Sequence, residues 1–219
     1  EAGRTIVMVT HEPEVAARAK YFPPLEVARK VRVMPLLTPD NFQEKVLELL
    51  KGAKRSVLFQ NQSLSSLGEN NEPGFRDLLE TLLRKQRELD DVRIILRGDF
   101  NPAVVLERLK EFGFDTRGDK LRLQKKCHTK GIIVDGKQVL VGSHNWTNQG
   151  TLVNRDASLI FHDEEIAQYY RDLFEFDWRH LARARVTEEF VPLELAEPGR
   201  ETPAGMAKLS LADLLYGDG

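Results

Sequence analysis

The chain is poor in the features that mark disulfide-bonded, membrane-spanning and metal-binding proteins. Cys127 is the only cysteine among 219 residues, so no intrachain disulfide can form. The cysteine content therefore does not indicate whether the protein works in an oxidising or a reducing compartment. No apolar run reaches the roughly eighteen residues that a membrane-spanning helix needs, so we expect no transmembrane segment. His, Cys and acidic residues show no metal-ligand spacing. We therefore expect a metal-independent protein without a cofactor.

Neither sign of charge dominates. The chain has 32 Lys and Arg against 34 Asp and Glu, which gives a net charge of -2 and a pI near 6.3. The net charge therefore creates no electrostatic field that would attract nucleic acid or an anionic membrane. A local basic patch remains compatible with these numbers. Hydrophobic residues make up 41% and charged residues 30%, as in an ordinary globular protein with one core.

Targeting signals are also missing from the sequence. No signal peptide is visible, and the chain begins at Glu1 rather than Met. We interpret it as a trimmed or processed product whose upstream targeting sequence could be missing. The compartment is unknown, and we expect a soluble protein that is cytoplasmic or peripheral to a membrane.

Strands and helices alternate in the first half of the chain. Thr38 is the predicted N-cap of a helix with Pro39 at its first position, and Gly52 ends that helix. The next predicted elements are a strand at 57–60, a helix at 75–83, a strand at 92–96 and a helix at 102–112. This alternation predicts an α/β layered domain.

Strands become more frequent in the second half. Residues 128–134 and 138–141 are predicted strands, and the Asp135-Gly136 pair between them predicts a hairpin turn. A strand at 157–161 and a helix at 164–176 follow, with Ile166, Tyr169, Tyr170 and Leu173 expected to face inward. The whole pattern predicts a mixed β-sheet flanked by α-helices on both faces. We place this domain at residues 31–186 and interpret residues 187–219, rich in Glu, Pro and Gly, as a surface tail.

Two short segments rich in polar residues flank the predicted hairpin strands. From His128 the sequence reads HTKGIIVD, and from Gly142 it reads GSHNWT. Together these segments give the pattern H-x-K-x(4)-D-x(6)-G-S-x-N. Its fixed positions are His128, Lys130, Asp135, Gly142, Ser143 and Asn145.

The spacing suits attack on a phosphodiester. Side chains two apart in a strand point the same way, so His128 and Lys130 are expected on one face. An imidazole can supply the nucleophile, while a fixed cation offsets charge on the pentacovalent transition state. Ser143 and Asn145, also two apart at the end of the paired strand, can add neutral donors to the same phosphate.

This pattern resembles the HKD signature of the phospholipase D superfamily. The resemblance covers about residues 31–180, which corresponds to one half of such an enzyme with a single motif. It implies that one motif His forms a phosphohistidine intermediate, while the other protonates the leaving alcohol and then activates water or an acceptor alcohol. It also implies that Lys130, Ser143 and Asn145 bind the phosphate, with His128 as the catalytic His of this half. It implies a structural role for Asp135, with Gly142 a structural glycine of the motif. Many members have Glu near position 156 to orient the catalytic His, so the shorter Asp156 is a candidate for that role.

Several neighbouring residues have plainer interpretations. His144 alternates away from Ser143 and Asn145, so we expect it to be non-catalytic, and Cys127 is expected to be a small buried residue. Trp146 and Trp178 are expected to pack in the core. Gln60 lies where related proteins have polar residues near the phosphate, so it is a candidate substrate-binding residue.

The mechanism that the resemblance implies needs two motifs, and the sequence contains one. Residues 6–16 resemble residues 157–167, which suggests that residues 1–24 are the last strand and helix of an upstream repeat; any strand followed by an amphipathic helix would look similar. The second motif would then lie in the upstream part of a longer chain. The alternative is a homodimer in which each copy gives one His.

The substrate is not fixed by the motif. A phosphodiesterase or phosphatidyltransferase acting on a phospholipid is the preferred interpretation, and a nuclease of the same superfamily is the first alternative. The basic residues that could favour nucleic acid or an anionic headgroup are Arg117, Lys120, Arg122, Lys125, Lys126 and Lys137. A non-catalytic phosphate-binding or oligomerisation module is the third possibility.

Overall fold

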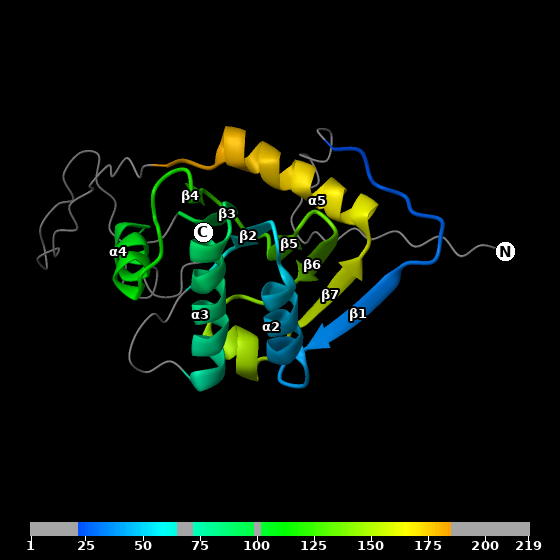
Figure 1. The fold of residues 1–219 in the computed structure, drawn as a ribbon, viewed down its shortest axis with the longest axis horizontal. Helices are drawn as coiled ribbons and strands as arrows, with labels where there is room; N and C mark the ends of the chain where they lie inside the picture. The colour runs from blue at the N-terminus through cyan, green and yellow to red at the C-terminus, as the bar shows by residue number, and fades with distance from the viewer. Residues whose placement is uncertain (1–21, 65–71, 99–101, 185–219) are drawn as a thin grey trace, which may run out of the picture. The chain divides into compact units, whose positions relative to one another are not determined.

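A mixed sheet of seven strands forms the centre of the domain (Figure 1). The computed structural model describes residues 22–64, 72–98 and 102–184. The elements are, in chain order, β1 (Arg32–Leu37), α2 (Phe42–Gly52), β2 (Ser56–Asn61), α3 (Pro73–Glu88), β3 (Asp91–Arg97), α4 (Pro102–Phe112), β4 (Leu121–Gln124), β5 (Gly131–Val134), β6 (Gln138–Gly142), β7 (Ala157–His162) and α5 (Glu164–Phe176). Two short π-helical turns, η2 (Gln149–Val153) and η3 (Asp177–Leu181), complete the described part.

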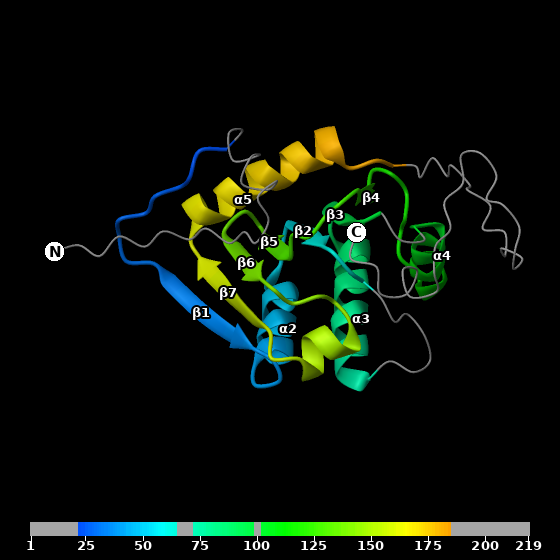
Figure 2. The same ribbon diagram turned by 180° about the vertical axis from the view of Figure 1, so that it is seen from behind.

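The sheet combines a parallel and an antiparallel part. Its strand order is β1-β7-β6-β5-β2-β3-β4, with β2, β3 and β4 parallel and all other neighbours antiparallel. Figures 1 and 2 show β1 and β4 at opposite ends of this row of strands. The predicted hairpin is confirmed as β5 and β6, and Asp135 adopts a φ of 56° in its turn.

Helices cover both faces of the sheet, as predicted, and each face has its own apolar cluster. On one face α2, α3 and α4 bury residues such as Phe42, Leu78 and Leu109 against Phe59. On the other face α5 buries Ile166, Ala167 and Phe174. Sequence analysis expected Tyr169, Tyr170 and Leu173 to face inward, but these three side chains are only partly buried. None of the helices within the described ranges is long and apolar enough to cross a membrane.

The predicted start of the first helix is wrong. Asn41, not Thr38, is the N-cap residue of α2, and the helix begins at Phe42. Thr38 is fully buried, and its hydroxyl contacts His144, far along the chain. The Thr38 hydroxyl therefore takes part in a tertiary hydrogen bond with His144 instead of capping the helix.

One edge of the sheet collects the ends of all the strands that carry the motif. The parallel strands β2, β3 and β4 end there, β5 and β7 begin there, and β1 and β6 end there. The register pairs Gln60 with Gly131, Gly142 with Ser158 and Leu37 with Ala157. Polar groups that follow or precede these strands are therefore brought together at this edge.

The predicted domain limits are only partly covered by the structure. The proposed upstream repeat tail, residues 1–24, lies outside the described residues except for its last three positions. The predicted surface tail, residues 187–219, lies wholly outside them. Both assignments stay predictions.

Candidate active site

His128 and Lys130 lie in the extended segment that precedes β5. The predicted strand 128–134 is shorter than expected, because its ladder begins at Gly131. The Lys130 side chain is buried, and its ammonium nitrogen Nζ donates to the His128 carbonyl oxygen at 2.8 Å. It also donates to the Gln62 Oε1 at 2.8 Å. These two hydrogen bonds fix the direction of the ammonium group.

Gln62, rather than the preferred candidate Gln60, is the glutamine that contacts Lys130. Sequence analysis selected Gln60, which lies within β2, whereas Gln62 follows the end of that strand. The Gln60 amide donates to Gln124 Oε1 at 3.1 Å and to Asp177 Oδ2 at 2.7 Å. The available signal was the position of Gln62, directly after β2 at the same sheet edge as Lys130.

Ser143 and Asp156 are joined across the ends of β6 and β7. The Ser143 hydroxyl donates to Asp156 Oδ1 at 2.7 Å, and its oxygen accepts the Ala157 backbone N–H at 3.1 Å. Ser143 is exposed, whereas its main chain is held by a bond from its N–H to the Ala157 carbonyl. Asp156 therefore fixes the hydroxyl of Ser143 at the open edge of the sheet.

Asn145 has a half-buried side chain with an unused acceptor. Its Oδ1 is buried and accepts no hydrogen bond within the part of the chain that the structure describes. Its neighbour Trp146 is buried and packs edge-on against Phe59, as expected for a core residue. Gly150 lies so close that a Cβ there would be 2.3 Å from the Asn145 carbonyl oxygen. The backbone of Asn145 is thus confined from two directions.

Asp135 and Gly142 shape the backbone around the hairpin of β5 and β6. The Asp135 carboxylate accepts the backbone N–H groups of Lys54, Arg55 and Ser56 at 2.7 to 2.9 Å. A Cβ at Gly142 would lie 1.9 Å from the Ser158 Oγ, so only glycine fits between β6 and β7 here.

Cys127 and His144 are buried beside the motif. Cys127 is 2% exposed, and its burial raises the pKa of the thiol to about 12, so it stays protonated. His144 is 1% exposed and contacts the hydroxyls of Thr38 and Ser158. Its burial lowers its pKa to about 4, with the nearby charge of Asp156 opposing this shift. The imidazole is therefore neutral near pH 7.

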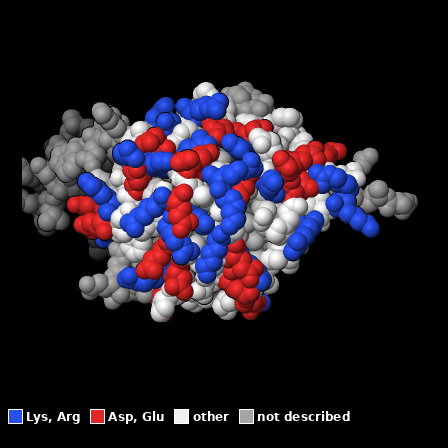
Figure 3. Space-filling view, viewed as in Figure 1, with Lys and Arg blue, Asp and Glu red and all other residues white. Residues whose placement is uncertain are grey.

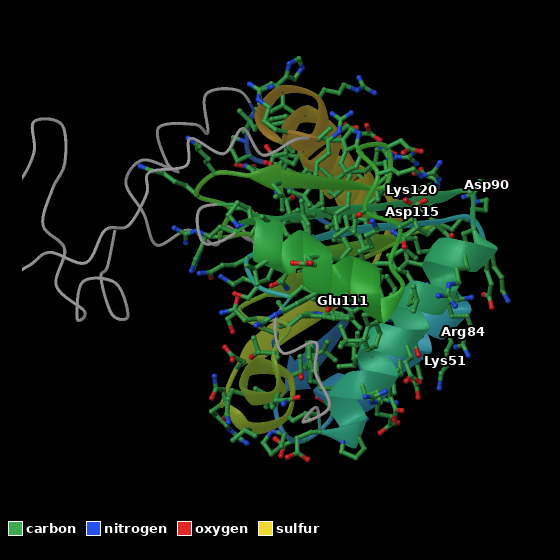
Figure 4. The ribbon with its side chains drawn as sticks, turned by 90° about the vertical axis from the view of Figure 1, so that its left-hand side faces the viewer. Lys51, Arg84, Asp90, Glu111, Asp115 and Lys120 are labelled. Carbon is green, nitrogen blue, oxygen red and sulfur yellow. The ribbon has the colours of Figure 1, made fainter. Side chains whose placement is uncertain are left out.

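The basic residues that surround the motif in sequence are dispersed in space. Arg117 pairs with Asp115, and Lys120 donates to the Asp90 carbonyl at 2.7 Å (Figure 4). The Arg122 guanidinium lies 4.5 Å from the centre of the buried Trp178 ring. On the face formed by α2 and α3, Lys and Arg alternate with Asp and Glu (Figure 3). Of the six basic residues, only Lys125 and Lys126 lie in the exposed turn that leads to His128.

A hollow of about 260 Å³ lies apart from the motif, between α2 and α3. Its lining includes Lys51 and Arg84, whose side chains Figure 4 shows on this side of the molecule. No residue of the motif lines it. Across residues 22–64, 72–98 and 102–184, no three His, Cys, Asp or Glu side chains form a group that could hold a metal ion.

Comparison with known proteins agrees with this geometry. The family model described as "Cardiolipin synthase, PLD-like domain" matches residues 46–178. The mitochondrial cardiolipin hydrolase of Xenopus laevis is 31% identical over 160 residues, which cover 72% of this chain and 70% of the relative. The Xenopus tropicalis protein of the same name is 30% identical over 148 residues, covering 56% and 70%.

Solved structures share the fold at lower identity. The phospholipase D family member Nuc from Salmonella typhimurium has a TM-score of 0.53 and 20% identity, covering 70% of this chain and 97% of that one. NucT from Helicobacter pylori has a TM-score of 0.50 and 15% identity, covering 70% and 99%. With a matching family model over most of its described domain, and with relatives named as hydrolases, the chain belongs to the phospholipase D superfamily, in the PLD-like domain family of cardiolipin synthase.

Proposed function

We propose that this chain supplies half of a metal-independent phosphodiesterase site in which His128 is the nucleophile. An imidazole nitrogen of His128 attacks phosphorus, and the bond from phosphorus to the leaving oxygen breaks. The leaving oxygen takes a proton from a second motif histidine and departs as an alcohol, and that histidine then removes a proton from the attacking water. Water displaces His128 from the phosphohistidine and releases a phosphomonoester. If an alcohol attacks instead of water, the same site is a phosphatidyltransferase.

The main observation behind the proposal is the fixed position of the Lys130 ammonium. Its ammonium is held by the neutral oxygens of Gln62 and the His128 main chain, directly beside the proposed nucleophile. A buried cation in a fixed position stabilises charge that develops on the phosphoryl oxygens without reorganising during the reaction.

Ser143, Asn145 and Asp156 complete the proposed half-site. The Asn145 side chain and the Ser143 hydroxyl are the candidate donors to the phosphate. The Ser143 hydroxyl donates to Asp156 in this structure, so it must turn its proton away when phosphate binds. Asp156 is then free to orient His128, as the family resemblance implies. Asp156→Asn tests this role and should lower kcat more than it raises KM.

The second histidine comes from outside the described half-site in this proposal. The upstream part of a longer chain remains the preferred source, and a homodimer partner is the alternative. Both place two half-sites around one phosphate.

A phospholipid is the preferred substrate. The relatives named cardiolipin hydrolases favour a phospholipid headgroup. The dispersal of the basic residues weakens the case for a nucleic-acid groove, because Arg117 and Arg122 are engaged with Asp115 and Trp178. Hydrolysis of anionic vesicles and of DNA should therefore be compared directly.

The first experiment measures hydrolysis of a chromogenic phosphodiester in EDTA over a wide range of protein concentrations. His128→Ala should lower the rate by about 10³-fold or more, because the nucleophile is lost. His180→Ala is the matched control, since His180 is exposed and lies outside the motif. A rate that rises with the square of protein concentration indicates that two copies build the site, and a fragment without activity must be joined to its upstream part before the assay is repeated.

Three outcomes would contradict the proposal. Full activity of His128→Ala excludes His128 as the nucleophile. Activity that EDTA abolishes excludes metal independence. Cleavage of DNA, with vesicles of phosphatidylcholine and cardiolipin left intact, replaces the phospholipid with nucleic acid.

A further inference from the structure

His144 occupies the variable position between the two proposed phosphate donors, but it is among the most enclosed polar residues of the domain. Its ring stacks on Phe42 with a centroid distance of 3.7 Å and an interplanar angle of 7°. Nδ1 lies 2.6 Å from the Ser158 Oγ, and Nε2 lies 2.7 Å from the Thr38 Oγ1. All three hydrogen-bonding side chains are at most 4% exposed. Both ring nitrogens of this buried imidazole have a hydrogen-bond partner, so the ring has one preferred orientation.

The hydrogen bond from Thr38 to Gly150 determines which atoms donate in this group of contacts. The Thr38 hydroxyl donates to the Gly150 carbonyl at 3.4 Å, so its oxygen accepts from His144 Nε2–H. Nδ1 is then the acceptor for the Ser158 hydroxyl. This assigns one neutral tautomer and one direction to the chain Ser158–His144–Thr38–Gly150. The lowered pKa of the buried imidazole agrees with a neutral ring.

Two members of this chain, Thr38 and Gly150, contact residues of the proposed site. The Thr38 backbone N–H donates to the Asp156 carbonyl at 3.2 Å. Gly150 lies next to the Asn145 carbonyl, so close that a Cβ at position 150 would collide with its oxygen. The His144 carbonyl itself accepts from the Asn61 side chain at 3.1 Å, which ties it to the end of β2.

We propose that His144 is a positioning residue that holds Ser143 and Asn145 in register with His128 by joining the ends of β1, β6 and β7. The inference rests on the proposed function for the phosphate-binding roles of Ser143 and Asn145. Strand alternation sends His144 into the core and leaves its two neighbours at the open edge, so the buried ring anchors the segment that carries both donors. A shift of about 1 Å in such donors can cost about 10²-fold in rate.

The variants are chosen to separate the hydrogen bonds from the packing. His144→Phe retains an aromatic ring on Phe42 and removes both hydrogen bonds. His144→Gln restores a donor directed at Thr38, and Ser158→Ala and Thr38→Val each remove one hydroxyl with little change in volume. Thr81→Val is the matched control, because Thr81 is a similarly buried threonine on α3, outside this chain of hydrogen bonds.

The test measures kcat and KM on a chromogenic phosphodiester together with amide hydrogen exchange of residues 143–147. We expect His144→Phe to lower kcat about 10²-fold with a smaller change in KM, and to speed exchange in this segment. His144→Gln should recover part of both, and Thr81→Val should change neither. Wild-type kcat in His144→Phe, or loss of kcat that is equal in Thr81→Val, overturns the inference.

Hydrogen exchange keeps the inference testable on its own. If the wild-type chain alone hydrolyses no phosphodiester, kcat gives no result, while exchange still reports whether His144 fixes the segment. Unchanged protection of residues 143–147 in His144→Phe, Ser158→Ala and Thr38→Val then overturns the positioning role. If His144→Phe does not fold, the two hydroxyl variants decide the result.

Discussion

At the scale of single residues, Asp135 illustrates how a motif position can serve the fold. Its carboxylate satisfies three backbone N–H groups before and at the start of β2, and its backbone adopts a left-handed conformation. Asp135→Ala should lower the free energy of unfolding by about 2–3 kcal/mol, measured by urea denaturation, because those N–H groups lose their partners. Asp135→Asn should lose less, since Asn tolerates this conformation and keeps one acceptor oxygen. Equal losses in both variants would contradict this explanation.

The same carboxylate gives a pH dependence. Burial opposes ionisation of Asp135, but the hydrogen bonds from Ser56, Lys54 and Arg55 outweigh it and hold its pKa below the ordinary value. Its stabilising contribution is therefore complete above the ordinary pKa of Asp and disappears as the pH falls through the lowered pKa of the folded state. The unfolding free energy of Asp135→Asn should change less over that acid range than that of the wild type.

His144 gives a second residue-scale prediction with the same sign, at a higher pH. Its folded-state pKa of about 4 lies below its ordinary value near 6.5, so the unfolded chain binds the proton first as the pH falls. Stability should decline between pH 6.5 and 4, by up to about 1.4 kcal/mol per pH unit. His144→Gln should remove this contribution, and the difference between the two denaturation series isolates it. Parallel series for wild type and variant would show that the imidazole is not held neutral.

How far the sequence predicts the site depends on the kind of contact. The motif spacing predicts the grouping of His128, Lys130 and Ser143, because these residues flank strands that pair locally. The contact between Gln62 and Lys130 depends on the pairing of β2 with β5, which no local pattern specifies. The participation of Thr38 was hidden for the same reason.

At the scale of elements, one arginine joins the parallel strands to the last helix. Arg93 on β3 forms a fork with Glu175 of α5 at 2.5 and 3.0 Å and also pairs with Asp91. Its guanidinium lies over the rings of Phe174 and Trp178. The cation therefore fixes α5 and η3 on the sheet through charge and stacking together.

Arg93→Met should lower the free energy of unfolding by about 2 kcal/mol, because Glu175 and Asp91 lose a partly buried partner. Arg93→Lys should recover only part of this, since an ammonium cannot form the same fork. Urea denaturation gives the comparison, with Arg84→Ala as the control for an exposed pair within one helix. A loss in Arg84→Ala as large as that in Arg93→Met would contradict the argument.

Element types were predicted better than element ends. The apolar periodicity of α3 and α5 places both helices correctly, and the alternation of strands predicts the mixed sheet. The errors lie at ends, where Thr38 serves His144 instead of capping α2 and where β5 begins at Gly131 rather than at His128. These ends meet the sheet edge, so distant residues decide their conformation.

At the scale of the whole molecule, the even balance of charge limits binding to polyanions. With a net charge of -2 and most motif-proximal arginines engaged, we expect duplex DNA to bind with a Kd weaker than about 100 µM at physiological salt. Fluorescence anisotropy at several salt concentrations measures this. A micromolar Kd with a steep salt dependence would instead favour the nuclease alternative.

The buried contact between Thr38, His144 and Ser158 has a consequence for the evolution of the family. Three positions on three strands or strand ends share one small polar network. Loss of either hydroxyl leaves one His144 ring nitrogen unmatched, and loss of His144 removes a partner from both hydroxyls. Divergence should therefore proceed at these positions jointly. Homologues with an apolar residue in place of His144 are expected to have lost the hydroxyls at the other two positions as well, and the three columns of an alignment should covary.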